Sequence, residues 1–283
     1  MAVITISRGS YSYGKEIAEK VAKMLGYECV SREILVEASQ LFNVSEKNLI
    51  LSLNNSPNIL ERIVHGKERH LEYIKTALLE YARKGNVVYH GHAGHLLLTE
   101  IPQVLKIRII ADKDNRINLL QKRENVTKET ATAIIENEDK NRTNWTRYLY
   151  KMDINDPKLY DIVINIGNLA IEEVCEIICF AARSNSYQTT NESKQAVEDL
   201  AIASRLRAVL QPVCDAEVFV KNGDVNVKVA AQKRKKTGYI SPALEQHIGE
   251  GYKNNLIGHI NEITHDIPGV KRVFCQVNSP YYT

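Results

Sequence analysis

Residues 2–16 read AVITISRGSYSYGKE, and this stretch decides the fold. Its first six residues are small or β-branched and mostly apolar, which predicts a buried strand over residues 2–7. A helical pattern covers residues 15–25 and ends at Gly26, a residue suited to a helix C-terminus. Residues 9–15 read GSYSYGK, so the spacing G-x-x-x-x-G-K lies between a strand and a helix, the setting that a phosphate-binding loop requires.

The residue types in this loop suit phosphate chemistry. A loop at a helix N-terminus presents unpaired N–H groups, and the helix dipole favours negative charge. Glycine lets the backbone approach a phosphate closely, and Lys15 adds a mobile positive charge. Glu16 occupies the position where Ser or Thr usually offers a hydroxyl to Mg²⁺, and Tyr11 and Tyr13 occupy positions that are usually small. The alternative is a glycine-containing turn that binds no nucleotide. The residues predicted to contact phosphates are Arg8, Gly9, Ser10, Tyr11, Ser12, Tyr13, Gly14, Lys15 and Glu16.

The first 183 residues alternate short β-rich runs with helical patterns, which indicates an α/β fold with a parallel sheet. Further strands are predicted over residues 27–30, 86–90, 105–111 and 162–166. Helices are predicted over residues 32–41, 45–53, 59–84, 113–123, 127–140 and 171–182, with Ser31 as a cap for the first of them. Residues 54–58 are expected to form a polar turn.

Four segments, taken in order, are similar to a known family: ITISR with GKEIAEKVAKMLGYECVSREIL, NVVYHGHAGHLLL, IRIIADKDNRI, and DKNRTNWTRYLYKMDINDPKLYDIVINIGNLAIEEV. Together they resemble the cytidylate-kinase-like family over about residues 1–182. The resemblance implies a P-loop NTPase-type sheet of five parallel strands with helices on both faces. It also implies transfer of the γ-phosphoryl group of ATP to a nucleoside monophosphate such as CMP or dCMP.

The same resemblance assigns roles to individual residues. Lys15, Arg142 and Arg147 are the expected catalytic cations, the two arginines lying in a lid over residues 139–150. Arg32 and His92 are expected at the acceptor. Glu16 agrees with the family, in which Mg²⁺ is held mainly through the nucleotide and water.

Three positions depart from the family pattern. Ser31 replaces the usual Asp, His92 replaces an Arg, and His90 replaces an acidic residue of cytidylate kinases. Arginine binds phosphate through two parallel hydrogen bonds, which neutral histidine cannot form. A non-catalytic nucleotide sensor is therefore the main alternative function, and a kinase for another small phosphoacceptor is a third.

Other titratable side chains in this part of the chain have simpler interpretations. His90, His92 and His95 have no further ligand at a recognisable spacing, so no metal site is predicted and acceptor-pocket histidines are favoured. Arg116 is expected to contact adenine, the lid or the protein core. Asp112 either orients water on Mg²⁺ or caps the helix that follows.

The remaining residues form a different kind of domain. Residues 184–195 are polar and predict a linker. Residues 196–283 predict the order α-β-β-α-β, with Asn222-Gly223 as a hairpin turn. EVFVKNGDVNVKV and ITHDIPGVKRVFCQV resemble the BON domain family, which implies ligand sensing or assembly into a homo-oligomer. The basic run at residues 233–236 is interpreted as a solvated loop, with an anionic surface as the alternative partner.

Bulk composition excludes several classes of protein. A net charge of +3 is too small to indicate nucleic-acid binding. No apolar run is long enough for a membrane span, and residues 1–15 do not resemble a signal peptide. The five cysteines are scattered and odd in number, which favours a reduced, cytoplasmic chain.

Overall fold

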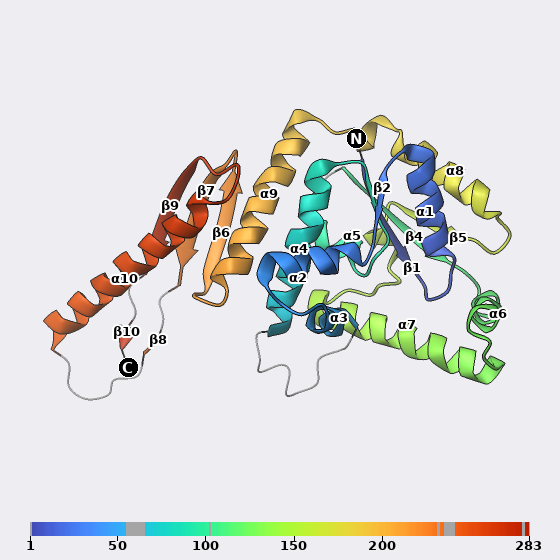
Figure 1. Cartoon of the computed structure of the whole chain (residues 1–283), viewed down its shortest axis with the longest axis horizontal. Helices are drawn as coiled ribbons and strands as arrows, with labels where there is room; N and C mark the ends of the chain where they lie inside the picture. The colour runs from blue at the N-terminus through green and yellow to red at the C-terminus, as the bar shows by residue number, and fades with distance from the viewer. Residues whose placement is uncertain are drawn as a thin grey trace. The chain divides into compact units, whose positions relative to one another are not determined.

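A five-stranded parallel sheet forms the centre of the first of two units, Met1–Ser193 and Lys194–Thr283, into which the chain divides (Figure 1). The computed structural model describes residues 2–54, 66–101, 103–230, 233–234, 241–278 and 281–282. The strand order is β2-β3-β1-β4-β5, and every neighbouring pair is parallel, as predicted. The strands are β1 (Val3–Arg8), β2 (Glu28–Val30), β3 (Val87–Tyr89), β4 (Val104–Ile110) and β5 (Ile162–Asn165).

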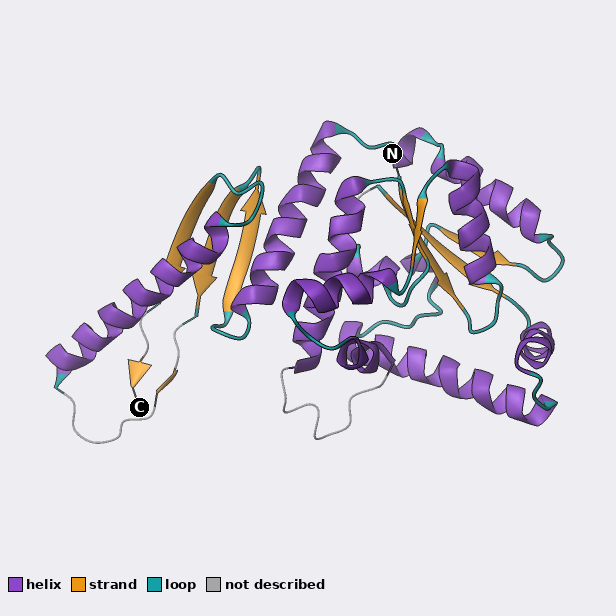
Figure 2. Cartoon of the chain, viewed as in Figure 1, coloured by secondary structure: helices purple, strands orange, loops and turns teal. Residues whose placement is uncertain are grey.

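Helices cover both faces of this sheet (Figure 2). On one face, α1 and α8 pack together and bury Ile4 and Ile6 of β1. Thr5 points to the opposite face, where it lies beside α5. This alternation follows from the two-residue period of a strand and gives β1 a buried position on both sides. The helices are α1 (Gly14–Leu25), α2 (Glu33–Phe42), α3 (Glu46–Asn54), α4 (Gly66–Lys84), α5 (Gly94–Leu97), α6 (Lys113–Glu124), α7 (Lys128–Tyr150) and α8 (Ile171–Ala182).

Helix α2 does not begin as predicted. Arg32, not Ser31, is the N-cap residue, and no side chain caps this end of the helix. The N–H of Ser31 instead donates to the carboxylate of Glu33 at 2.6 Å. The predicted turn over residues 54–58 and the start of the helix predicted from residue 59 fall largely on residues 55–65, which lie outside the described residues.

Helix α7 extends ten residues beyond its predicted end. It continues through residue 150 and ends at Lys151, which adopts a left-handed conformation with φ of 56°. No glycine or proline interrupts it, and Ala131, Ile135 and Trp145 bury one of its faces. The expected lid over residues 139–150 is therefore the second half of a continuous helix.

The second unit has the predicted order α-β-β-α-β. Its three-stranded sheet has the order β6-β7-β9, with β6 antiparallel and β9 parallel to β7. A separate apolar core joins this sheet to its two helices. A further short pair, β8 (Lys233–Arg234) with β10 (Tyr281–Tyr282), was not predicted. The main elements are α9 (Asn191–Leu210), β6 (Ala216–Lys221), β7 (Asp224–Val229), α10 (Pro242–His265) and β9 (Arg272–Val277).

Two local features decide where the elements of this unit begin. Asn222 and Gly223 have φ of 53° and 82°, so they form the predicted hairpin turn. Helix α9 begins inside the predicted linker because Thr190 and Ser193 exchange hydrogen bonds at its start. Only the backbone of residues 233–234 is described in the basic run, so its predicted solvation lies outside the described residues.

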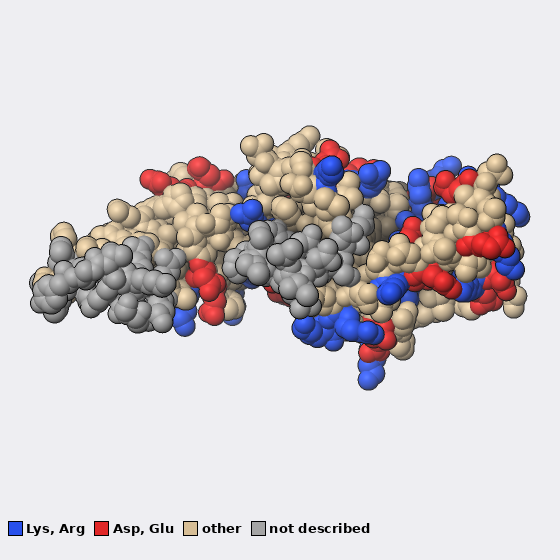
Figure 3. All heavy atoms as spheres, turned by 90° about the horizontal axis from the view of Figure 1, so that it is seen from below, with Lys and Arg blue, Asp and Glu red and all other residues tan. Residues whose placement is uncertain are grey.

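The described part of the chain has a surface of mixed charge and unpaired cysteines. On the face in Figure 3, positively and negatively charged side chains are interspersed. All five cysteines are free thiols. Among the described residues, no helix combines the length and apolar character needed to cross a bilayer.

Candidate functional site

The loop between β1 and α1 has an unusual backbone. Tyr11 and Tyr13 both adopt left-handed conformations, with φ of 57° and 60°. Such conformations turn successive N–H groups toward one side of a loop and form a concave anion-binding surface. They are uncommon for large side chains and mark a constrained backbone. The sequence indicated these positions as atypical, and the structure adds that their conformation is atypical too.

Hydrogen bonds hold this loop against the sheet. Ser12 is fully buried, and its hydroxyl donates to the carbonyl of Gly9 at 2.9 Å. The N–H of Gly9 donates to the carbonyl of Ile109 in β4 at 3.2 Å. Ser10 is also buried, and its hydroxyl has no protein partner in the described part of the chain. The loop is therefore fixed at its base before any ligand binds.

Lys15 and Glu16 lie in the first turn of α1. The Lys15 side chain is 60% exposed, and its Nζ is 3.7 Å from the carboxylate of Glu19. Glu16 is partly buried and lies 3.7 Å from Lys20. A mobile cation at a helix N-terminus suits a polyphosphate, and the ion pair between Lys15 and Glu19 is weak and solvent-exposed.

A cavity of about 140 Å³ lies at the carboxyl ends of β1 and β3. Two histidines line it, and each has a buried ring nitrogen without a partner in the described residues: Nδ1 of His90 and Nε2 of His92. We call this space the histidine cavity. Its lining residues are Ser7, Arg8, Ser31, His90, Gly91, His92, Ala93, Arg142 and Ile154.

The histidines of this cavity are held in the neutral form. Burial lowers the pKa of His92 from 6.5 to about 3, and the positive charge of Arg142 adds to the shift. Burial and the charge of Arg8 also lower the pKa of His90. A neutral imidazole both donates and accepts hydrogen bonds, so these rings can contact a ligand's polar groups but add no charge.

His95 belongs to a different environment from the other two histidines. Its Nε2 is 3.2 Å from the hydroxyl of Tyr160, and burial lowers its pKa to about 3. His92 instead packs edge-on against Trp145, with ring centroids 4.5 Å apart. No group of three or more His, Cys, Asp or Glu side chains in the described part of the chain is placed to hold a metal ion.

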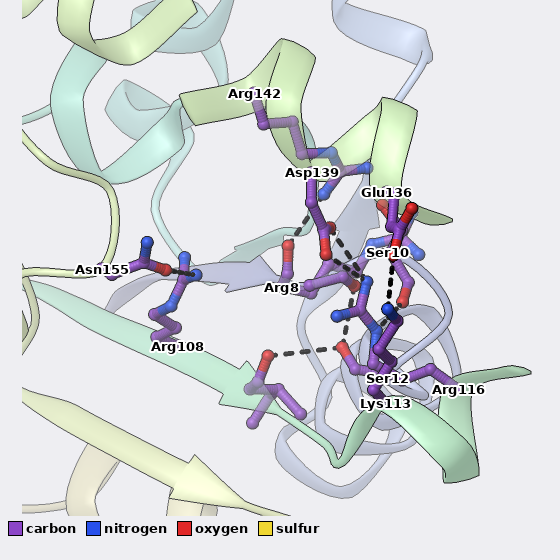
Figure 4. A network of polar contacts seen from close by, with 12 residues as sticks. Arg8, Ser10, Ser12, Arg108, Lys113, Arg116, Glu136, Asp139, Arg142 and Asn155 are labelled. Atoms are coloured by element: carbon purple, nitrogen blue, oxygen red, sulfur yellow. Dashed lines mark hydrogen bonds and ion pairs between the residues drawn. The ribbon is translucent and has the colours of Figure 1, made fainter. Parts of the chain in front are cut away.

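A second cavity, of about 290 Å³, lies on the β4 side of Arg8. Four arginines line it, with Asp139 as the one carboxylate of its lining, and we call it the arginine cavity. Figure 4 shows the polar contacts around it. Its lining residues are Arg8, Gly9, Arg108, Ile110, Ala111, Arg116, Asp139, Arg142, Thr143, Ile154 and Asn155.

Helices α6 and α7 bring two of these arginines to the phosphate loop. Arg116 donates from Nε to the carbonyl of Ser10 at 2.6 Å and pairs through NH2 with both oxygens of Asp139, at 2.9 and 2.8 Å. Arg142 donates to the carbonyl of Arg8 at 2.8 Å. Arg116 therefore contacts both the phosphate loop and the segment expected to form the lid, and Arg142 lies against the end of β1.

Arg32, Arg147 and Asp112 lie apart from both cavities. Arg32 is exposed at the start of α2, and Arg147 is exposed on α7. Residues five apart on a helix point about 140° from one another, so Arg147 does not share the face of Arg142. Asp112 is the N-cap residue of α6, but its side chain makes no capping hydrogen bond. It lies near Gly167, at the end of β5.

A third cavity, of about 550 Å³, opens beside Tyr13. It lies between α6 and the segment that links β5 to α8. It is more open and less charged than the arginine cavity, with one lysine and one glutamate in its lining. Its lining residues are Tyr13, Asn115, Asn118, Leu119, Lys122, Ile166, Gly167, Leu169, Ala170, Ile171 and Glu172.

Sequence reasoning did not identify Arg108 or Asn155. Arg108 lies within β4 and is 8% exposed, and it donates to Asn155 Oδ1 at 2.9 Å and to the Tyr160 hydroxyl at 3.2 Å. The available signal was an arginine between isoleucines in the strand VLKIRII, which also contains Lys106. Nothing in the sequence around Asn155 indicates its position.

The parallel sheet, the loop at the start of α1 and the flanking helices define an α/β domain of the P-loop kinase type. A sequence model of the cytidylate kinase-like family matches residues 3–168, and the chain belongs to this family. A cytidylate kinase from Ignicoccus hospitalis is 28% identical over 63% of this chain and 97% of its own length. One from Pyrococcus horikoshii is 29% identical over 62% of this chain and 85% of its own length.

Solved structures similar to part of this chain have low sequence identity to it. An uncharacterised protein from Eubacterium ventriosum is 19% identical with a TM-score of 0.48, over 65% of this chain and all of that one. A shikimate kinase from Bacteroides thetaiotaomicron is 11% identical with a TM-score of 0.39, over 65% of this chain and 99% of that one.

Proposed function

We propose that this protein transfers the γ-phosphoryl group of ATP to a nucleoside monophosphate, with CMP or dCMP as the acceptor. One observation carries the proposal: Arg8 and Gly9, where the phosphate loop begins, line the same cavity as Arg142 of α7. In such a reaction, the bond between the γ-phosphorus and its bridging oxygen breaks, and a bond to an acceptor phosphate oxygen forms. Catalysis of this kind rests on positioning and on cations that offset developing charge.

In this proposal, the loop residues from Arg8 to Glu16 bind the donor phosphates. The mobile side chain of Lys15 stays close to the negative charge of the γ-phosphoryl group during its transfer. The cavity beside Tyr13 takes the donor's base, because it adjoins the loop and is the largest of the three described. Arg142 contacts the phosphoryl group in transfer. Arg147 is exposed, so any catalytic role for it requires α7 to move.

The acceptor is proposed to occupy the histidine cavity. Arg8 and Arg142 line it and offer positive charge to the acceptor phosphate, while His92 offers a neutral polar contact. Arg32 lies at the start of α2, next to the lining residue Ser31, and would reach the acceptor from that side.

Mg²⁺ fits this site only as an ion carried by the nucleotide. Glu16 supplies one carboxylate beside the loop, and the buried Ser12 hydroxyl is already bonded to the protein. Mg²⁺ keeps several waters and commonly binds through substrate phosphates, so one nearby carboxylate is enough. When bound, the ion would offset phosphate charge, and Glu16 would orient water around it.

A non-catalytic nucleotide sensor is the second candidate function. The two neutral histidines, His90 and His92, favour this function. Neither adds a positive charge to the acceptor site, whereas an arginine at the same position would add a cation that binds phosphate. Nucleotide binding would then be passed to the second unit. The BON-like resemblance of that unit motivates a role in ligand sensing or homo-oligomer assembly.

A coupled assay with ATP, Mg²⁺ and a panel of nucleoside monophosphates tests the proposal. We expect turnover with CMP or dCMP and a fall of at least about 100-fold in kcat/KM for Lys15→Ala, because a phosphate-contacting cation is lost. Lys23→Ala, on the last turn of the same helix, is the matched control. ATP binding without transfer to any acceptor would replace the kinase proposal with the sensor.

A further inference from the structure

The charges that line the arginine cavity do not balance. Its lining contains four arginines and one carboxylate, and both oxygens of that carboxylate are taken by Arg116. Arg8, Arg108 and Arg142 form no ion pair with any carboxylate in the part of the chain that the structure describes. The cavity therefore carries excess positive charge in a partly buried space.

Arg108 is the least exposed of these cations. Only 8% of it is accessible, and its partners are a carboxamide oxygen and a phenol hydroxyl, both neutral. The ring of Tyr160 lies 5.4 Å from its guanidinium carbon. A buried cation is strongly unfavourable unless an opposite charge accompanies it. Two of its five N–H groups account for these bonds, and the other three form no hydrogen bond with the described residues, so they can contact a ligand.

Arg8 and Arg142 add to the imbalance from the other wall. Burial lowers the pKa of each guanidinium. The charge of Arg142 lowers the pKa of Arg8 further, and the charges of Arg116 and Arg108 lower that of Arg142, while the nearby Glu138 opposes the shift in both. Their proximity is maintained by the bond from Arg142 to the Arg8 carbonyl. An anion placed between them would relieve this repulsion.

The size of the cavity suits a small oxyanion. A volume of about 290 Å³ is several times the roughly 30 Å³ share of one water molecule, so an ion and its waters fit. Guanidinium groups bind oxyanions through paired hydrogen bonds, and they converge here from β1, β4, α6 and α7 (Figure 4).

We infer that the arginine cavity binds a tetrahedral oxyanion the size of phosphate, and that Arg108 provides much of its affinity. The ion has two sources, free inorganic phosphate or a phosphoryl group of a bound substrate. Only the second source rests on the proposed function. A purely structural Arg108, which tethers Asn155, is the competing explanation.

The test measures binding of inorganic phosphate to the full chain without nucleotide, by calorimetry and by thermal unfolding against sodium chloride of equal ionic strength. Wild-type protein should bind phosphate saturably and gain thermal stability from it. Arg108→Met should weaken phosphate binding at least tenfold. Arg183→Met removes an exposed arginine from the end of α8 and should leave binding unchanged.

Stability separates a ligand site from a structural tether. Replacing a buried, unbalanced cation with an apolar chain of similar length should keep or raise the stability of the phosphate-free protein. If Arg108→Met loses stability but keeps phosphate affinity, the tether explanation replaces the inference. If Arg108→Met does not fold, Arg142→Met tests the same cavity from α7, and undiminished phosphate affinity there would overturn the inference.

The phosphate loop is the rival site for the ion, and Lys15→Ala distinguishes the two. Affinity lost in Lys15→Ala but kept in Arg108→Met would place phosphate in the loop and overturn the inference. If Mg-ATP displaces phosphate from wild-type protein, the cavity receives a substrate's phosphoryl group; if both bind together, free phosphate is its ligand. Phosphate binding and phosphoryl transfer are measured separately, so either proposal can fail alone.

Discussion

His92 is a residue whose chemistry is set by its surroundings. Burial and Arg142 hold it neutral beside the histidine cavity, and burial also holds His95 neutral beside Tyr160. Both pKa values are near 3, whereas an unfolded histidine titrates near 6.5. The unfolded chain therefore takes up these protons first as the pH falls.

We expect the free energy of unfolding to decrease as the pH falls from about 6.5 toward 3, because the folded pKa values lie below the unfolded ones. Each of the two histidines contributes up to about 1.4 kcal/mol per pH unit within that window, and neither contributes above it. Urea unfolding at pH 7, 6 and 5 measures the slope. His95→Gln should reduce it.

His265 provides the control for this pH dependence. Its side chain is 89% exposed, in contrast to the buried His95. His265→Gln should leave the slope unchanged. An equal slope in His95→Gln and wild-type protein would contradict the assignment.

Gly14 is a position where a side chain would collide with a site residue. A Cβ atom there would lie 2.6 Å from Cδ and 2.8 Å from Cβ of Arg8. We expect Gly14→Ala to displace Arg8 and to lower stability by about 1–3 kcal/mol, as overpacking does elsewhere. It should also weaken phosphate binding in the arginine cavity.

Gly258 gives the matched comparison for this substitution. It lies within α10, and a Cβ atom there would meet nothing within 4 Å. Gly258→Ala should raise stability by about 0.5–1 kcal/mol, because alanine favours a helix more than glycine does. Urea unfolding of both variants measures the contrast, and equal effects would show that contact with Arg8 is unimportant.

At the scale of elements, α6 and α7 are joined by two ion pairs of different burial. Arg116 and Asp139 are 12% and 38% exposed, and the arginine also reaches the phosphate loop. Lys113 and Glu136 join the same helices from positions that are 54% and 60% exposed. Burial and paired hydrogen bonds favour the first pair.

A double-mutant cycle on each ion pair measures its coupling free energy, which should differ between the two pairs. We expect a coupling of about 1 kcal/mol between Arg116→Gln and Asp139→Asn, and below about 0.5 kcal/mol between Lys113→Gln and Glu136→Gln. Urea unfolding at low and high salt provides the free energies. Equal couplings would mean that burial does not distinguish the pairs.

The elements were predictable where the pattern is local. β1, the loop and α1 follow from one continuous stretch, because strand period, glycine spacing and helix period change at clear points. The predicted end of α7 was wrong. The second half of this helix is polar, and only Trp145 and Thr146 are buried there, so its sequence shows no clear helical pattern. The predicted start of α9 was also wrong. The hydroxyl side chains of Thr190 and Ser193 cap this helix within a segment whose composition is typical of a linker.

The candidate site was predictable only in part. Loop residues share one motif, whereas the arginine cavity is assembled from β1, β4, α6, α7 and the segment after α7. Arg108 and Asn155 lie 47 residues apart in sequence and meet only in the folded chain. Arg147 was grouped with Arg142 because both lie in the segment that resembles a lid, although the helix places them on different faces.

At the scale of the whole molecule, two separate cores predict two folding units. One core lies between the parallel sheet, α1 and α8, and the other between the second sheet, α9 and α10. Helix α9 begins at Asn191, so a division before that residue keeps the helix whole.

We expect fragments 1–190 and 191–283 each to fold with a cooperative thermal transition, because each retains a complete core. Circular dichroism and the solution mass of both fragments and the full chain provide the measurement. A fragment 1–190 with unchanged mass and activity would leave no role for the second unit in assembly or regulation. Loss of cooperative unfolding in either fragment would show that its core depends on the remainder of the chain.

Trp145 is the only tryptophan in the chain, and it is completely buried on α7. Its indole N–H donates to the carbonyl of Ser52 in α3 at 2.8 Å, and its ring faces His92. The tryptophan fluorescence of the protein therefore comes from a single known place beside the histidine cavity. Ligand entry there, or movement of α7, can be followed as a change in emission without any added label.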